Sequence, residues 1–174
     1  MRAARRKELL RRLVHRAADD DAAASAGGVV WPPGTSAHPS LLEAVRDLSA
    51  AEAERRAPDG GPTLRELVRE ATDRKRAALW AWDHDEAHPD GVPAADPAPD
   101  PHPEAAWRHE REAFARASRG VQERLAAADD RLLDRVIPGA DASVADIALE
   151  LATFDAYCAG RATVLRAVAG DDTD

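Results

Sequence analysis

The stretch LATFDAYCAG, residues 151–160, belongs to a longer segment in which apolar residues recur every three or four positions. Residues at that spacing share one face of a helix, so the pattern predicts a helix that begins near Ser143 and faces a core. The residues predicted to point inward are Val144, Ile147, Ala148, Leu151, Phe154, Cys158, Leu165 and Val168. Phe154 and Cys158 are four residues apart on this face, the spacing at which two histidines would bind one metal ion.

Three earlier segments show the same helical periodicity. Residues 38–61 carry Leu41, Leu42, Val45 and Leu48 on one side, and Asp59 to Pro62 then break the chain. Thr63 and Glu66 form a T-x-x-E capping box that opens a helix over residues 63–82. Helical spacing resumes over residues 103–128. Since short breaks between helices favour antiparallel neighbours, these segments predict an up-and-down helical bundle.

The segments outside this pattern define the domain boundaries. Residues 5–17 predict an additional amphipathic helix, with Leu9, Leu10, Leu13, Val14 and Ala17 on one stripe and solvated basic residues around it. We expect residues 1–35 to hold this helix and a flexible connector, residues 36–170 the four-helix bundle, and residues 171–174 a tail. Residues 83–103 contain half of the chain's twelve prolines, which predicts a long exposed loop within the bundle.

Composition agrees with a helical protein and excludes several functions. Of 174 residues, 44% are hydrophobic and only 4% are aromatic, and many of the apolar residues are alanine, which favours helix over strand. The net charge of −8 argues against binding to nucleic acid. The single cysteine cannot form an intrachain disulfide, and no apolar run suits a signal peptide or a membrane span. We therefore expect a cytoplasmic protein that contacts neither nucleic acid nor membrane.

The sequence around Phe154 and Cys158 resembles the DinB-like (DinB/YfiT-like) superfamily of four-helix bundles. FDAYCAGR, residues 154–161, is similar to that family's H-D-x-Y-H-A-G-Q motif. Residues 38–53 look like the family's opening helix, residues 62–79 its second helix, and residues 137–165 its last turn and final helix. The resemblance covers residues 36–168. It implies an all-α four-helix bundle, here with an additional N-terminal helix.

In that family, one histidine on the second helix and two on the last helix hold a divalent metal. The matching positions here are Glu70, Phe154 and Cys158, and none of them is histidine. Carboxylate and thiolate groups bind zinc, whereas phenylalanine has no donor atom. The resemblance therefore implies a bundle that has lost its standard metal site, with His38 or the proline-rich loop as the remaining source of a further ligand.

The rest of the expected pocket also follows from the resemblance. The chain keeps the family residues Asp155, Tyr157, Ala159 and Gly160. Arg161 stands where an amide is common in the family. Asp155 and Tyr157 are candidates either for the pocket or for hydrogen bonds within the bundle. Glu70 is a candidate for an ion pair with Arg161 or Arg74.

Two hypotheses of function come from this pattern. The first is a DinB-like bundle without metal or catalysis, which binds a small apolar or amphipathic ligand or a protein partner and needs no cofactor. The second is a metal- or thiol-dependent transferase or hydrolase, in which Cys158 is the nucleophile, Glu70 is its base, and zinc or nickel is the cofactor. A further possibility from the resemblance is that the protein works as a homodimer formed through an exposed helix face.

Two features of the sequence allow more than one interpretation. Cys158 is either a small buried hydrophobe or a reactive thiol, and reactivity requires a nearby cation to lower its pKa. His84 and His88 form a second histidine pair four residues apart among acidic residues, but Pro89 disfavours helical geometry at His88. We therefore interpret this pair as part of a solvated loop.

Overall fold

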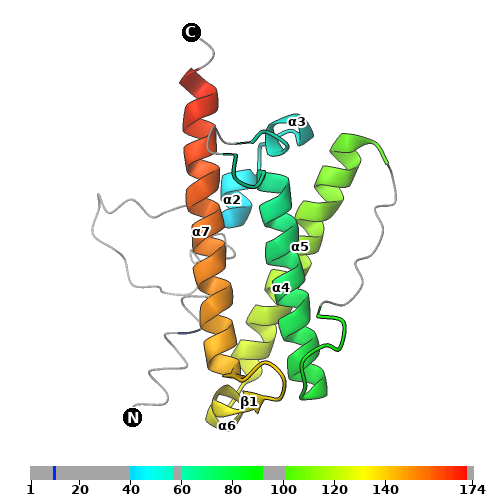
Figure 1. Ribbon diagram of the computed structural model, residues 1–174, viewed down its shortest axis with the longest axis vertical. Helices are drawn as coiled ribbons and strands as arrows, with labels where there is room; N and C mark the ends of the chain where they lie inside the picture. The colour runs from blue at the N-terminus through cyan, green and yellow to red at the C-terminus, as the bar shows by residue number, and fades with distance from the viewer. Residues whose placement is uncertain (1–9, 11–39, 57–59, 92–100, 172–174) are drawn as a thin grey trace, which may run out of the picture.

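The computed structural model describes residue 10 and residues 40–56, 60–91 and 101–171 (Figure 1). Its elements in chain order are α2 (Leu41–Val45), α3 (Ala50–Ala53), α4 (Leu64–His84), α5 (Pro103–Ala127), α6 (Asp130–Asp134), β1 (Val136–Ile137), β2 (Ala142–Ser143) and α7 (Val144–Asp171). The two strands form one short antiparallel pair. The described part of the chain is thus predominantly helical, as the sequence predicts.

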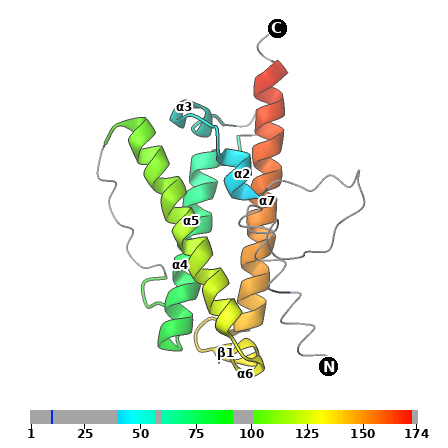
Figure 2. The ribbon, with the colours of Figure 1, turned by 180° about the vertical axis from the view of Figure 1, so that it is seen from behind.

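The long helices α4, α5 and α7 pack side by side, but their directions do not alternate along the chain (Figures 1 and 2). Arg65 at the start of α4 pairs with Glu110 in the first part of α5. Asp83 at the end of α4 pairs with Arg124 near the end of α5. Helices α4 and α5 are therefore parallel, while α7 runs in the opposite direction. The prediction of an up-and-down bundle is wrong for this pair of helices.

The connection between α4 and α5 explains their parallel arrangement. Residues 85–102 separate the two helices, and an extended chain of about 18 residues reaches up to about 60 Å. Helix α5 has 25 residues, which corresponds to a length of about 38 Å. The connection is therefore long enough to return from the end of α4 to the level of its beginning. A connection of this length does not force the two helices to be antiparallel, as a short loop would.

The described beginning of this connection packs against the strand pair. Helix α4 ends at His84, and Asp85 follows in the left-handed conformation with a φ of 59°. The backbone N–H of Ala87 donates to the carbonyl oxygen of Pro138 at 2.9 Å. Gly139 has a φ of +80°, and a Cβ built there would lie 3.2 Å from the Cβ of Ala87. Glycine at this turn thus permits both the backbone conformation and the close approach.

The segment expected to form the opening helix is instead two short helices. Ser40 caps α2 and Ser49 caps α3, and each serine forms a full capping box with the glutamate three residues later, Glu43 and Glu52. The second capping box at Ser49 starts a new helix where the apolar periodicity suggested continuation. The capping box predicted at Thr63 and Glu66 is confirmed at the start of α4.

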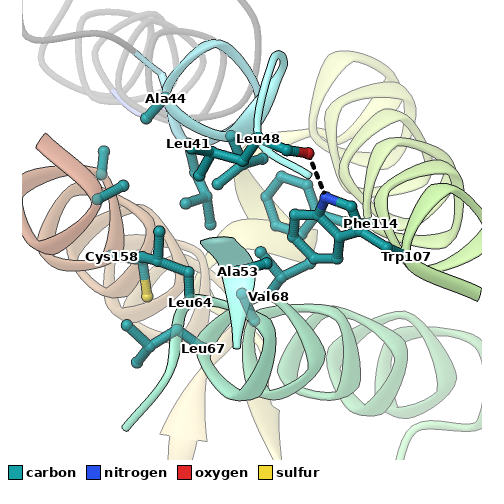
Figure 3. Packing of buried hydrophobic residues seen from close by; sticks show 14 of the residues in the cluster. Leu41, Ala44, Leu48, Ala53, Leu64, Leu67, Val68, Trp107, Phe114 and Cys158 are labelled. Atoms are coloured by element: carbon teal, nitrogen blue, oxygen red, sulfur yellow. Dashed lines mark hydrogen bonds between the residues drawn. The ribbon is translucent and has the colours of Figure 1, made fainter. Parts of the chain in front are cut away.

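Two apolar clusters fill the interior. The upper cluster lies near α2 and α3 and contains Leu41, Ala44, Val45, Leu48, Ala50, Ala53, Leu64, Leu67, Val68, Ala71, Trp107, Phe114, Cys158, Ala159 and Ala162. The lower cluster lies near α6 and the strands and contains Leu10, Ala78, Ala81, Trp82, Val121, Leu125, Ala128, Leu133, Ile137, Val144, Ala145, Ala148, Leu151 and Ala152. In the upper cluster the fully buried Trp107 donates from Nε1 to the carbonyl oxygen of Leu48 at 2.8 Å (Figure 3).

The predicted boundaries at the ends of the chain are only partly covered. Leu10 is helical and buried in the lower cluster, and the other residues of the predicted N-terminal helix lie outside the described residues. Residues 11–39, including His38, and the tail at 172–174 lie outside the described residues. Within the described part of the chain, no helix combines the length and apolar character needed to cross a membrane.

Candidate functional site

The expected metal position lies on the seam between α4 and α7, and its three residues have separate surroundings. Glu70 on α4 is exposed, and its carboxylate accepts from Arg74 Nη2 at 2.8 Å. Arg74 also donates from Nη1 to Glu150 Oε1 at 3.0 Å and lies 4.2 Å above the centre of the Phe154 ring. The predicted ion pair between Glu70 and Arg74 is confirmed. Arg74 therefore covers the seam from the solvent side.

Cys158 occupies the third expected position but lies inside the core. Its side chain is 0% exposed and belongs to the upper cluster, beside Leu64 and Leu67 (Figure 3). Burial, together with the nearby carboxylate of Asp155, raises the pKa of the Cys158 thiol to about 12. The thiol is therefore neutral at pH 7. A buried neutral thiol has neither the access nor the acidity of a catalytic nucleophile.

One turn before Cys158, a buried ion pair crosses the same seam. Lys75 Nζ on α4 donates to Asp155 Oδ1 on α7, and the two side chains are 1% and 3% exposed. Lys75 Nζ also lies 4.4 Å from the centre of the Phe114 ring on α5. Burial lowers the pKa of Lys75 and raises the pKa of Asp155, while the attraction between the two groups opposes both shifts. The ion pair therefore places the Lys75 ammonium group of α4 against the Asp155 carboxylate of α7 inside the bundle.

The Lys75–Asp155 pair lies between the two apolar clusters. On α4, Lys75 separates Ala71 of the upper cluster from Ala78 of the lower cluster. On α7, Asp155 lies between Ala152 of the lower cluster and Cys158 of the upper cluster. A buried serine on α5, Ser118, falls between Phe114 and Val121 in the same way. Each long helix thus contributes one polar residue to a layer, called here the polar layer, that divides the core.

The resemblance led to Asp155 but missed its partner. Lys75 falls on the inward stripe of α4, three or four residues from apolar positions on either side. A charged residue on such a stripe needs an opposite charge from a facing element, because an unpaired buried charge is very costly. Asp155 occupies the equivalent inward position on α7. The sequence signal for the pair is therefore two opposite charges at helical spacing from apolar residues, one on each helix.

The other predicted pocket residues do not converge on one point. Tyr157 is 51% exposed and points away from the core, and Arg161 is half-buried one turn further along α7. Phe154 and Tyr157 line a shallow hollow of about 460 Å³ together with Arg74 and Leu149, called here the α7 hollow. The structure therefore places Asp155 and Cys158 inside the bundle and Glu70, Phe154 and Tyr157 at or near its surface.

The residues of the seam do not fit a metal ion. Phe154 has no donor atom, the carboxylate of Glu70 is bound to Arg74, and the Cys158 thiol is protonated and enclosed. Two protein donors of this kind fall short of the three that a catalytic zinc site requires. Nowhere among residues 10, 40–56, 60–91 and 101–171 do three His, Cys, Asp or Glu side chains form a group that could hold a metal ion.

The pair His84 and His88 is more ordered than its interpretation as a solvated loop suggests. The His84 ring stacks on Trp80 with a centroid distance of 4.2 Å, and the His88 ring meets the same indole edge-on at 4.7 Å. His84 is also the last residue of α4 and not part of the loop. The two imidazoles therefore pack against Trp80 and do not face one another across a metal position.

Comparisons of the chain with protein-family models, with curated proteins and with solved structures returned no match.

Proposed function

We propose that the chain is a DinB-like four-helix bundle that acts as a binding module without a metal cofactor. One observation carries this proposal: the α4–α7 seam, where catalysis would be expected, is filled by the Lys75–Asp155 pair and the enclosed Cys158 thiol. The pair neutralises the interior charge without a metal, and the thiol is held in its unreactive form. Short α2 and the buried Leu10, which pack with the upper and the lower cluster, support a fourth helical position in the bundle.

The α7 hollow is the surface on this seam that suits a ligand. Leu149 is 48% exposed and Tyr157 is 51% exposed, and both line the hollow beside the ring of Phe154. Arg74 adds a cation at its edge, already engaged with Glu70 and Glu150. A surface with apolar rings and a charged rim suits a small amphipathic ligand or a partner helix.

Elemental analysis tests the absence of a metal cofactor. The full chain, purified without a histidine tag, is analysed as isolated and after loading with zinc, nickel or manganese. We expect less than stoichiometric metal in every case, because the seam offers too few free donors. One equivalent of metal that disappears in both Cys158→Ser and Glu70→Gln, but stays in Glu123→Gln, would overturn the proposal. Glu123 is an exposed carboxylate on α5 away from the seam, so its variant controls for nonspecific charge effects.

Alkylation of Cys158 tests the absence of thiol catalysis. Iodoacetamide is added at pH 7 to the folded chain and to the chain in urea, and the modified fraction is followed by mass spectrometry. Since the thiol is buried and protonated, we expect labelling of the folded chain to be at least about a hundredfold slower. Equal rates in the folded and unfolded chain would support the transferase or hydrolase hypothesis instead.

A further inference from the structure

A second concave surface lies on the opposite side of α4, between α4 and α5. It is a groove of about 570 Å³, and four of its lining residues are arginines: Arg65, Arg69 and Arg76 from α4 and Arg116 from α5. We call it the arginine groove. Its acidic lining residues are Asp73 and Glu110. The chain as a whole carries a net charge of −8, so a groove with an excess of cations is a local reversal of the protein's charge.

The helical repeat explains why the arginines gather there. Residues 65, 69 and 76 are separated by four and seven positions, so they project from one face of α4. The facing side of α5 carries small residues at the same repeat, namely Ala106, Ala113 and Ala117. Small side chains leave space between the two helices, and the long arginine side chains line the space without filling it. The groove is therefore built by a specific pattern on two parallel helices.

At the upper end of the groove, the carboxylate of Glu110 fixes the arginine side chains. Glu110 receives both Arg65 Nε at 2.7 Å and Arg65 Nη2 at 2.9 Å, and its Oε1 also accepts from Arg69 Nε at 2.9 Å. The Glu110 side chain is 15% exposed. Arg65 Nη1 also donates to Glu54 Oε1 at 2.7 Å, so two carboxylates fix the two guanidinium groups at this end of the groove.

The lower end of the groove is lined by Arg76 and Asp73 from α4 and by Arg116 from α5. Lys75 lies against Phe114 and Asp83 against Arg124, so Arg76 on α4 is level with Arg116 on α5. Arg116 is exposed and makes no ion pair or hydrogen bond with any residue that the structure describes. Partial burial raises the pKa of Asp73, while the nearby charges of Arg76 and Arg69 oppose this shift. Two arginines from different helices therefore line one end of an open groove.

We propose that the arginine groove binds a small molecule through a phosphate group. A phosphate presents three oxygen acceptors in a tetrahedral arrangement, so it can accept from Arg76 on one helix and Arg116 on the other. The planar carboxylate of Glu110 instead accepts from Arg65 and Arg69, which both belong to α4. The proposal rests on the proposed function only in treating the chain as a binding module, because the groove shares no lining residue with the α7 hollow.

Calorimetric titration with inorganic pyrophosphate tests the proposal on the full chain. We expect saturable one-site binding at low salt that weakens as salt is added. Arg116→Gln and Arg76→Gln should each weaken binding by at least about tenfold, because each removes a charge-assisted contact. Asp73→Asn should strengthen it by a few fold, since it removes a negative charge from the groove. Circular dichroism shows whether each variant keeps its helices.

Arg108→Gln is the matched control. Arg108 is an exposed arginine on the same helix as Arg116, two turns earlier, and it does not line the groove. Its loss should change pyrophosphate affinity by no more than about twofold. Absence of saturable binding to the wild-type chain, equal weakening by Arg108→Gln and Arg116→Gln, or tighter binding of citrate than of pyrophosphate would each overturn the proposal. A stoichiometric metal at Cys158 would overturn the proposed function and leave the groove unaffected.

Discussion

Helix α4 makes charged contacts on two sides, and the two sides differ in their exposure to water. Towards α7, Lys75 and Asp155 are both fully enclosed. Towards α5, Arg65 and Arg69 share Glu110 at the edge of an open groove, and Arg69 is 55% exposed. A buried pair cannot lose one member without leaving an unpaired charge in the core, whereas exposed arginines can exchange protein partners for water or for a ligand. The same kind of contact therefore serves stability on one side of the helix and is available for binding on the other.

Removing one member of the buried pair should have the largest effect on stability. Lys75→Met leaves the Asp155 carboxylate without its partner, so we expect a loss of about 3–5 kcal/mol in the free energy of unfolding. The double variant Lys75→Met with Asp155→Leu removes both charges and should recover most of that loss. Urea denaturation measures both. If Lys75→Met lowers the free energy of unfolding no more than a surface arginine variant does, the contacts on the two sides of α4 do not differ in their contribution to stability.

The buried side should also respond to alkaline pH through Cys158. Because the folded-state pKa is raised from 9.0 to about 12, the folded chain retains the thiol proton where the unfolded chain loses it. The stabilising contribution is therefore complete below pH 9 and is lost as the pH rises through this window. We expect a decrease of up to about 1.4 kcal/mol per pH unit. Denaturation of the wild type and of Cys158→Ala at pH 8 and pH 10 isolates this contribution, and equal pH dependence in both would contradict it.

The exposed side should tolerate the loss of its carboxylate better. Glu110→Gln leaves Arg65 paired with Glu54 and leaves Arg69, which is 55% exposed, accessible to water, so we expect a cost of about 1 kcal/mol. The same substitution should strengthen pyrophosphate binding, because it removes a negative charge from the groove and frees the guanidinium group of Arg69. Sodium chloride at 1 M should reduce the cost of Glu110→Gln but leave that of Lys75→Met unchanged, since salt screens exposed charges far more than buried ones. Denaturation at two salt concentrations makes this comparison.

The smallest effect is expected for the surface pairs of Arg74. Its two carboxylate partners, Glu70 and Glu150, have side chains that are 49% and 68% exposed. Arg74→Gln should therefore cost less than about 1 kcal/mol, most of it through lost contact with the Phe154 ring. A substantially larger loss in urea denaturation would mean that Arg74 closes the seam as a structural element and not only as a surface cation.

Local sequence signals predicted where most helices begin. The Thr63–Glu66 capping box and Pro103 mark the starts of α4 and α5, and Ser143 precedes the first residue of α7, as the sequence indicated. These signals are reliable because a cap depends on residues only three positions apart. The relative direction of α4 and α5 depends instead on the path of a long connection. No local pattern encodes that path, so the expectation based on short loops failed there.

The candidate site was predictable only to the extent that one helix defines it. Residues 154–161 contain the family-like motif, and Phe154, Asp155 and Cys158 do lie on the seam with α4. Lys75 was missed because the resemblance directed attention to Glu70, five residues earlier on the same helix. The arginine groove was missed for a different reason. Its residues look like ordinary surface positions on each helix, and only the parallel packing of α4 and α5 brings them together.

The polar layer formed by Lys75, Ser118 and Asp155 bears on the cooperativity of the fold. Apolar contact is interrupted at this level, so the two clusters are joined mainly through the helix backbones and one ion pair. Each half of the bundle can then open with its own free energy, in the manner of separate cooperative units. Backbone amides beside the upper cluster and those beside the lower cluster should exchange with deuterium in two groups, and neutralising the layer with paired apolar residues should merge them into one.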